Sequence, residues 1–148
     1  MKTSSMCLSC ILLLLGALPW SARGQSPTPV TFSADSRGQV NFVMPSKNIG
    51  CTFTPQGGTA VYQPFDGGPE LSCDRIKPQY VRLVVTPKTV HRFDNVGDRD
   101  CCGADNVFAY GSRWTHGPFT CESADTGLTC RHSGGRGFSI SQANIRIY

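Results

Sequence analysis

The sequence predicts an all-β protein, a small disulfide-stabilised antiparallel β-sandwich or a partly open barrel. Three observations support this fold class. Short segments rich in β-branched and aromatic residues recur along the chain. Turn-forming residues separate them, with 16 Gly and 10 Pro among 148 residues. No window keeps a 3.6-residue apolar period over three turns, so no amphipathic helix is predicted.

Residues 1–24 have the pattern of a secretory signal peptide. Lys2 precedes an apolar run from Ile11 to Leu18, and Ala22 and Gly24 supply the small residues that a signal peptidase reads. The run is shorter than the ~20 residues of a membrane-spanning helix. The next cysteine after the run is Cys51, too far along the chain to be a lipid-anchor cysteine. We therefore expect an exported protein, periplasmic or secreted, with no membrane insertion after cleavage.

The remaining chain is predicted to be a flexible lead-in, 25–37, followed by a single β domain, 38–148. Leu83 to Val85 is continuously apolar, which predicts a strand covered on both faces, whereas Phe138 to Ser141 alternates and predicts a half-buried strand. The predicted strands are Val30–Phe32, Val40–Val43, Ile49–Phe53, Ala60–Tyr62, Leu71–Cys73, Tyr80–Val85, Thr89–Phe93, Val107–Tyr110, Phe119–Cys121, Leu128–Arg131, Phe138–Ser141 and Ile145–Tyr148.

Residues 56–69 form a long insert framed by two glycine pairs, Gly57-Gly58 and Gly67-Gly68. Such loops in compact domains often bind partners. An elaborated surface hairpin around Ala60–Tyr62 is the simpler interpretation.

Two of the 8 cysteines, Cys7 and Cys10, fall within the predicted signal peptide. Six cysteines remain, and an even number of cysteines in an exported chain predicts a disulfide framework. The remaining cysteines are Cys51, Cys73, Cys101, Cys102, Cys121 and Cys130.

Two pairings follow from local sequence. Cys121 and Cys130 flank a turn-forming stretch that contains Gly127, so a disulfide closing this hairpin is predicted. Cys51 and Cys73 are the next predicted pair, closing a loop rich in glycine and proline.

The adjacent Cys101 and Cys102 leave three alternatives open. They form a vicinal bridge, remain a pair of thiols, or join separate bridges. Neighbouring Cα atoms are about 3.8 Å apart, closer than the 4.4–6.8 Å of ordinary disulfides, so a vicinal bridge is uncommon. A redox switch is the functional interpretation, and a structural pair is the simpler one.

Charge and motifs exclude several function classes. Loss of Lys2 and Arg23 with the signal lowers the net charge from +4 to +2, which argues against nucleic-acid binding. The acidic stretch 94–100 lacks the glutamate of a calcium loop and is interpreted as a polar turn. None of the three histidines lies in a known nucleophile motif. We expect no cofactor, no metal site and no enzymatic activity.

The candidate binding residues are an aromatic and polar group, Tyr110, Arg113, Trp114 and His116. Aromatic side chains beside arginine suit a recognition surface. Trp114 lies in a loop-like stretch between Gly111 and Gly117, so we expect it to be exposed, whereas we expect Tyr110 in the core.

Five ordered motifs carry a family resemblance. They are Pro45–Cys51, Leu71–Asp74, Tyr110-Gly111, Gly117–Cys121, and Gly127–Cys130 leading to Gly137–Ser141. In this order the chain resembles a family of small exported bacterial proteins catalogued as a domain of unknown function. Lys47 stands where that family often has glycine, and Arg136 where it often has histidine. The resemblance implies an exported β-rich fold and brings no activity with it.

The sequence therefore leaves competing functions. The first is a non-enzymatic module that binds a protein of the cell envelope, as an inhibitor or immunity-like factor does. The alternative is a cell-surface glycan-binding module that uses Trp114. A third is a small enzyme whose site follows no known motif.

Overall fold

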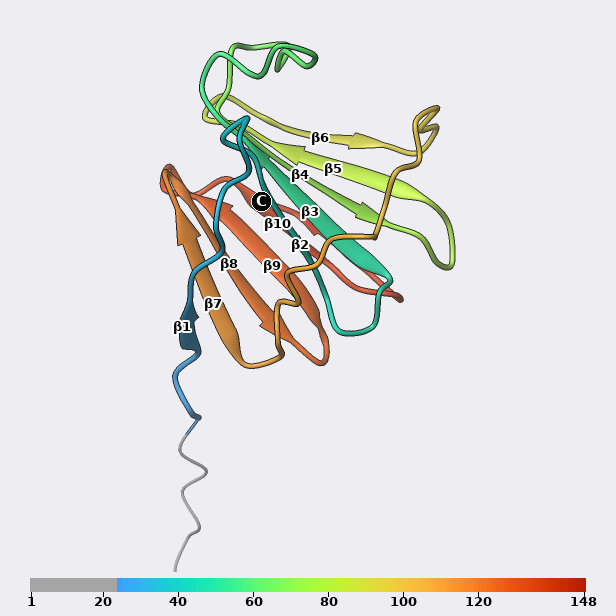
Figure 1. The fold of residues 1–148 in the computed structure, drawn as a ribbon. Helices are drawn as coiled ribbons and strands as arrows, with labels where there is room; N and C mark the ends of the chain where they lie inside the picture. The colour runs from blue at the N-terminus through green and yellow to red at the C-terminus, as the bar shows by residue number, and fades with distance from the viewer. Residues whose placement is uncertain (1–23) are drawn as a thin grey trace, which may run out of the picture.

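The computed structural model describes residues 24–148, which form two β-sheets packed face to face as a sandwich (Figure 1). The predicted signal segment, with Cys7 and Cys10 and apart from Gly24, lies outside the described residues. One sheet has the strand order β1 (Thr28–Val30), β7 (Ser112–His116), β8 (Phe119–Ala124), β9 (Gly127–His132), β10 (Gly137–Ile140) and β11 (Ile145–Ile147). The other has the order β2 (Val40–Val43), β3 (Ile49–Thr54), β4 (Glu70–Arg75), β5 (Val81–Val85) and β6 (Val90–Phe93).

Neighbouring strands are antiparallel except β1 and β7, which are parallel. The sheets do not close into a barrel, so the all-β sandwich prediction is confirmed. Within residues 24–148, no helix has the length and apolar character needed to cross a membrane.

The core lies between the sheets and follows the two-residue period of the strands. Phe42 contacts Phe108 and Trp114, with ring centroids 5.2 and 5.0 Å away. Phe119 and Phe138 are fully buried on the opposite sheet. Leu83, Val84 and Val85 are all buried, which confirms the strand expected to be covered on both faces.

Both predicted cross-strand disulfides are present in the core. Cys51 pairs with Cys73 directly across β3 and β4, and Cys121 with Cys130 across β8 and β9. Their sulfurs meet across the sandwich, since those of Cys51, Cys73 and Cys130 lie within 4.8 Å of one another. Each bridge stabilises the fold by about 3 kcal/mol on the chain-entropy model. Of the three alternatives for Cys101 and Cys102, the structure has the vicinal bridge. These three disulfides indicate an oxidising compartment.

Four segments differ from the predicted strands. Of Val30–Phe32 only Val30 is in a strand, since β1 is Thr28–Val30. Ala60–Tyr62 is not a strand, because the Thr59 hydroxyl accepts the backbone N–H groups of Val61 and Tyr62 and makes a turn. Of Val107–Tyr110, only Val107 forms a single bridge, to Val43. Conversely, the stretch between Gly111 and Gly117 is loop-like in sequence but forms β7. Ser112 and Trp114 point inward and Arg113 and Thr115 outward, as in an ordinary strand.

The segment expected to be a flexible lead-in is part of the fold. Its residues Thr28–Val30 form β1, and Phe32 packs against the rings of Phe42 and Phe108 at 5.5 and 5.8 Å. The proline-rich sequence is compatible with an edge strand, where the missing N–H of Pro29 faces away from its neighbour.

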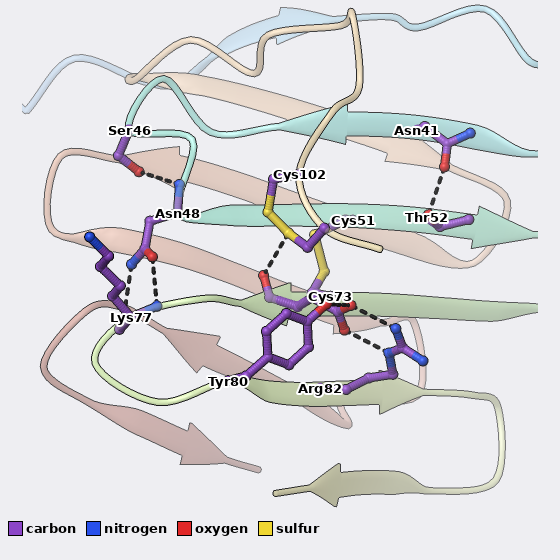
Figure 2. The surroundings of a disulfide bond; sticks show 12 residues. Asn41, Ser46, Asn48, Cys51, Thr52, Cys73, Lys77, Tyr80, Arg82 and Cys102 are labelled. Atoms are coloured by element: carbon purple, nitrogen blue, oxygen red, sulfur yellow. Dashed lines mark hydrogen bonds and ion pairs between the residues drawn. A yellow bond between two sulfur atoms is a disulfide. The ribbon is translucent and has the colours of Figure 1, made fainter. Parts of the chain in front are cut away.

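The turn between β2 and β3 is fixed by two residues of the Pro45–Cys51 motif. The side chain of Asn48 accepts the Lys77 N–H at 2.8 Å and donates to the Lys77 carbonyl at 3.0 Å, linking this turn to the one after β4 (Figure 2). Lys47 has φ 57°, a left-handed conformation that favours glycine.

Candidate functional site

Trp114 is not a surface residue, contrary to expectation. Its side chain is 1 % exposed, lies 5.0 Å from Phe42 and stacks on His116 at 5.6 Å. The glycines on either side end a five-residue strand rather than a loop, and the strand directs its largest apolar residue inward.

The other predicted binding residues do not gather around one hollow. Arg113 lies on the face of β7 opposite to Trp114 and forms an ion pair with Glu122, with an N–O distance of 2.7 Å. His116 is half-buried against Trp114 and Phe53. Tyr110, expected in the core, is 44 % exposed. Because successive strand residues point to opposite faces, Arg113 and Trp114 cannot serve one surface.

A hollowed surface lies instead on the outer face of the five-stranded sheet. Here the strands present two rows of side chains away from the core. In register across β2 to β6, the rows are Asn41, Thr52, Ser72, Val84 and His91, and Val43, Gly50, Asp74, Arg82 and Phe93. Two depressions adjoin on this face, with volumes of about 250 and 860 Å³.

A buried aspartate organises the middle of this face. Asp74 accepts a bidentate ion pair from Arg82, with both N–O distances 2.7 Å, and the hydroxyl of Tyr80 at 2.5 Å. Figure 2 shows Tyr80 and Arg82 directed at the same carboxylate. Burial, together with the hydrogen bond to Asp74, raises the pKa of Tyr80 to about 12. The cluster is therefore internally neutralised and rigid.

The segment 94–106 covers one side of the larger depression and carries the vicinal disulfide. Asn106 binds the edge of β2, donating its side-chain amide to the Asn41 carbonyl at 2.8 Å. Cys101 Sγ lies 3.6 Å from the Asp74 carbonyl oxygen. A Cβ atom at Gly50 would lie 3.1 Å from both sulfurs of the vicinal pair, so glycine permits this close approach.

A second buried carboxylate, Glu70, lies between the two depressions, which share it as a lining residue with Tyr62, Arg82 and Asp98. Glu70 is 2 % exposed, and its Oε1 accepts the Tyr62 hydroxyl at 2.8 Å. Its Oε2 is buried with no hydrogen-bond partner among residues 24–148. Burial raises the pKa of Glu70, and the hydrogen bond from Tyr62 and the charge of Arg82 oppose this shift only in part.

Exposed apolar side chains surround the smaller depression. Phe65 is 66 % exposed, and Tyr62 and Phe93 are each 45 % exposed; all three line it. The imidazole of His91 lies between the two phenylalanines, 4.9 Å from Phe65 and 6.0 Å from Phe93. Val61, at the larger depression, is the most exposed large apolar residue described, at 80 %.

This rim comes from elements far apart in sequence. In Figure 1 the insert 56–69 (green) rises at one end of the five-stranded sheet, beside the edge strand β6 (yellow). Partner binding was one interpretation of the insert, beside the simpler one of a surface hairpin, and in the structure Val61, Tyr62 and Phe65 of the insert line the depressions. Glu70, Tyr62 and Phe93 were not predicted as site residues. Their only signal was proximity to the insert or to the end of a predicted strand.

The one cluster of metal-ligating residue types among residues 24–148 is Cys51, Cys73 and Cys130. All three sulfurs are in disulfides and buried in the core, so they offer no thiolate to a metal ion.

Comparisons of this chain with family models, with curated proteins and with solved structures found no match.

Proposed function

We propose that this protein is an exported, non-enzymatic binding module, acting in the periplasm or the medium, whose partner is another protein of the cell envelope. It binds through the outer face of the five-stranded sheet, in the manner of an inhibitor or immunity-like factor.

The observation that carries this proposal is the distribution of exposed apolar side chains. Eight large apolar residues are exposed in the described chain, and Val61, Tyr62, Phe65 and Phe93 of these surround the adjoining depressions. Aromatic residues of this kind are enriched at protein interfaces. An exposed cluster beside a depression is typical of an interaction surface, whereas scattered single residues are not.

The scaffold beneath this face also suits binding. The Cys51–Cys73 bridge joins β3 and β4, whose outward residues form the floor of the larger depression. A floor cross-linked in this way loses little conformational freedom when a partner docks, which favours affinity.

The glycan alternative loses its sequence argument, because it required an exposed Trp114 and that side chain is 1 % exposed. A sugar would have to stack on Tyr62, Phe65 or Phe93 instead. We therefore keep glycan binding as an outcome of the test.

The test is affinity capture with the oxidised protein, from a cell-envelope extract and, separately, on insoluble cell-wall glycan. The double variant Phe65→Ser/Phe93→Ser removes the apolar rim. Tyr110→Ser is the matched control, since Tyr110 is as exposed as Phe93 and lines neither depression.

We expect one protein recovered near one-to-one by the wild type and the control and lost by the double variant. Equal recovery by all three proteins would overturn the proposed face. Retention on the glycan, abolished in the double variant, would replace the protein partner with a glycan.

A further inference from the structure

The larger depression is acidic although the protein is basic overall. The chain has 14 basic and 10 acidic residues. Six acidic residues line this depression, against two basic ones; the acidic residues are Asp35, Glu70, Asp74, Asp98, Asp100 and Asp105. A hollow lined by charges of one sign concentrates and steers a partner of the opposite sign.

Both basic residues of this depression are already paired within it. Arg37 bonds Asp35 at 3.0 Å, and Arg82 bonds Asp74 at 2.7 Å. Arg99, between Asp98 and Asp100 in the chain, lies over the ring of Tyr80, with its guanidinium carbon 5.3 Å from the ring centroid, and donates to the Val96 carbonyl. In the part of the chain that the structure describes, the other four carboxylates, at positions 70, 98, 100 and 105, have no ion-pair partner. The depression therefore carries uncompensated negative charge.

Glu70 distinguishes this surface from an ordinary group of solvated carboxylates. Its side chain is almost fully buried, yet Oε2 lacks a hydrogen-bond donor. Buried polar atoms in native proteins are nearly always bonded, so an orphaned carboxylate oxygen indicates a missing donor. This oxygen belongs to a residue that lines both depressions.

The smaller depression matches one long side chain. Its volume of about 250 Å³ lies below the ~300–1,000 Å³ usual for small-molecule sites. Tyr62, Phe65 and Phe93 offer aromatic faces, Glu70 and Asp98 offer carboxylates, and the cation in the lining, Arg82, is paired with Asp74. A guanidinium group stacks on aromatic rings and binds carboxylates bidentately, so arginine suits this lining better than lysine does.

We propose, building on the function proposed above, that the protein partner presents an arginine side chain that enters the smaller depression and pairs with Glu70. The surrounding acidic groups receive further basic residues of the same segment. Oε2 is shielded from water, so pairing requires a local movement. Tyr62, which bonds the neighbouring oxygen and is 45 % exposed, is the group that moves.

The test uses three blocked decapeptides, alternating glycine with arginine, citrulline or glutamate. Citrulline keeps the shape of arginine and removes its charge. Binding to the oxidised protein is followed by titration with backbone-amide NMR. We expect binding of the arginine peptide alone, with shifts in β4, β5 and 94–106.

Glu70→Gln should weaken arginine-peptide binding at least tenfold, because the amide keeps the shape of the carboxylate and removes its charge. Glu122→Gln is the matched control, since Glu122 is the other glutamate and pairs on the opposite sheet with Arg113. We expect it to bind within twofold of the wild type. Unchanged binding by Glu70→Gln, or equal binding of the citrulline peptide, would overturn the inference.

The same variants separate this inference from the proposed function. If the captured envelope protein depends on Phe65 and Phe93 but binds Glu70→Gln as well as wild type, the protein-binding function stands and the arginine anchor is wrong. If capture depends on none of these residues, the proposed function itself fails.

Discussion

Glu70→Gln should make the protein more stable at neutral pH, in contrast to its effect on binding. In the wild type, folding removes the Glu70 carboxylate from water and leaves Oε2 without a donor. A buried polar group left unsatisfied costs about 1–3 kcal/mol, and more when charged. The buried glutamine amide would also lack a second hydrogen-bond partner. Glu70→Gln therefore removes only the part of the penalty that depends on the negative charge. We expect the free energy of unfolding to rise by about 1 kcal/mol at pH 7, or about 4 °C in Tm.

The direction of the Glu70 pKa shift determines how the stability difference between the two proteins changes with pH. Burial raises the pKa of Glu70 on folding, so the folded state holds this proton more tightly than the unfolded state does. Wild-type stability therefore falls as pH rises from the unfolded-state pKa through the folded one. The glutamine variant has no such loss. Its advantage should be largest at pH 7 and close to zero at pH 4, where the wild-type carboxyl is protonated.

The assay is equilibrium urea unfolding of the oxidised proteins, at pH 4 and pH 7, followed by the fluorescence of Trp114. This is the sole tryptophan after the predicted signal segment, and its burial makes it a sensitive probe. Asp35, whose pKa is lowered in the fold, titrates in both proteins and cancels in the difference. The negative charge of Asp66 adds to the rise in the pKa of Glu70 and is therefore part of the effect that is measured. Glu122→Gln, in an exposed ion pair, should change stability by less than about 1 kcal/mol at either pH.

A glutamine variant that is less stable than wild type at pH 7 would refute this reasoning. So would a difference of the same size at both pH values. The first result would mean that the ionised carboxylate is stabilised in place, with Arg82 the positive charge that acts on it. The second would mean that the stability difference does not come from the charge of Glu70.

Three other substitutions test the fold around the site. Trp114→Ala should destabilise the protein by about 3–5 kcal/mol in urea unfolding followed by circular dichroism, because it empties a fully buried position; a loss below 1 kcal/mol would contradict the core assignment. Gly50→Ala should cost about 1–2 kcal/mol and speed hydrogen exchange in 94–106, since its Cβ would press on the vicinal disulfide; unchanged exchange would count against this contact. Lys47→Gly should stabilise by about 0.5–1 kcal/mol in the same unfolding assay by relieving a positive φ, and destabilisation would show that the lysine side chain contributes there.

Local patterns were sufficient for much of the fold. The two core disulfides were predictable because each pair flanks a short turn or a glycine-rich loop between adjacent strands. The strand at Trp114 was missed because five residues between two glycines are too few to distinguish a strand from a loop. Its alternation of inward Ser112 and Trp114 with outward Arg113 was the available signal.

Most of the candidate site could not be predicted from local patterns, because its residues are brought together by the pairing register of different strands. Arg82 meets Asp74 only because β5 pairs with β4 in this alignment, and Phe93 joins them from β6. A shift of one residue would turn all three into the core. Glu70 carries no local signature, since its importance lies in an unpaired oxygen that only the packed structure reveals.

The alternation of inward and outward residues along β3 and β4 connects the rigid core with the candidate binding face. On β3 and β4, Cys51 and Cys73 point inward and bridge, while their neighbours Gly50, Thr52 and Ser72 point outward into the larger depression. The disulfide that stabilises the sandwich therefore also fixes the spacing of the floor beneath a partner. Glu70, at the start of β4, keeps one carboxylate oxygen without a hydrogen-bond partner on this fixed floor. A rigid scaffold can tolerate such a local penalty, and a partner's cation would relieve it, so stability and binding should respond to Glu70→Gln in opposite directions.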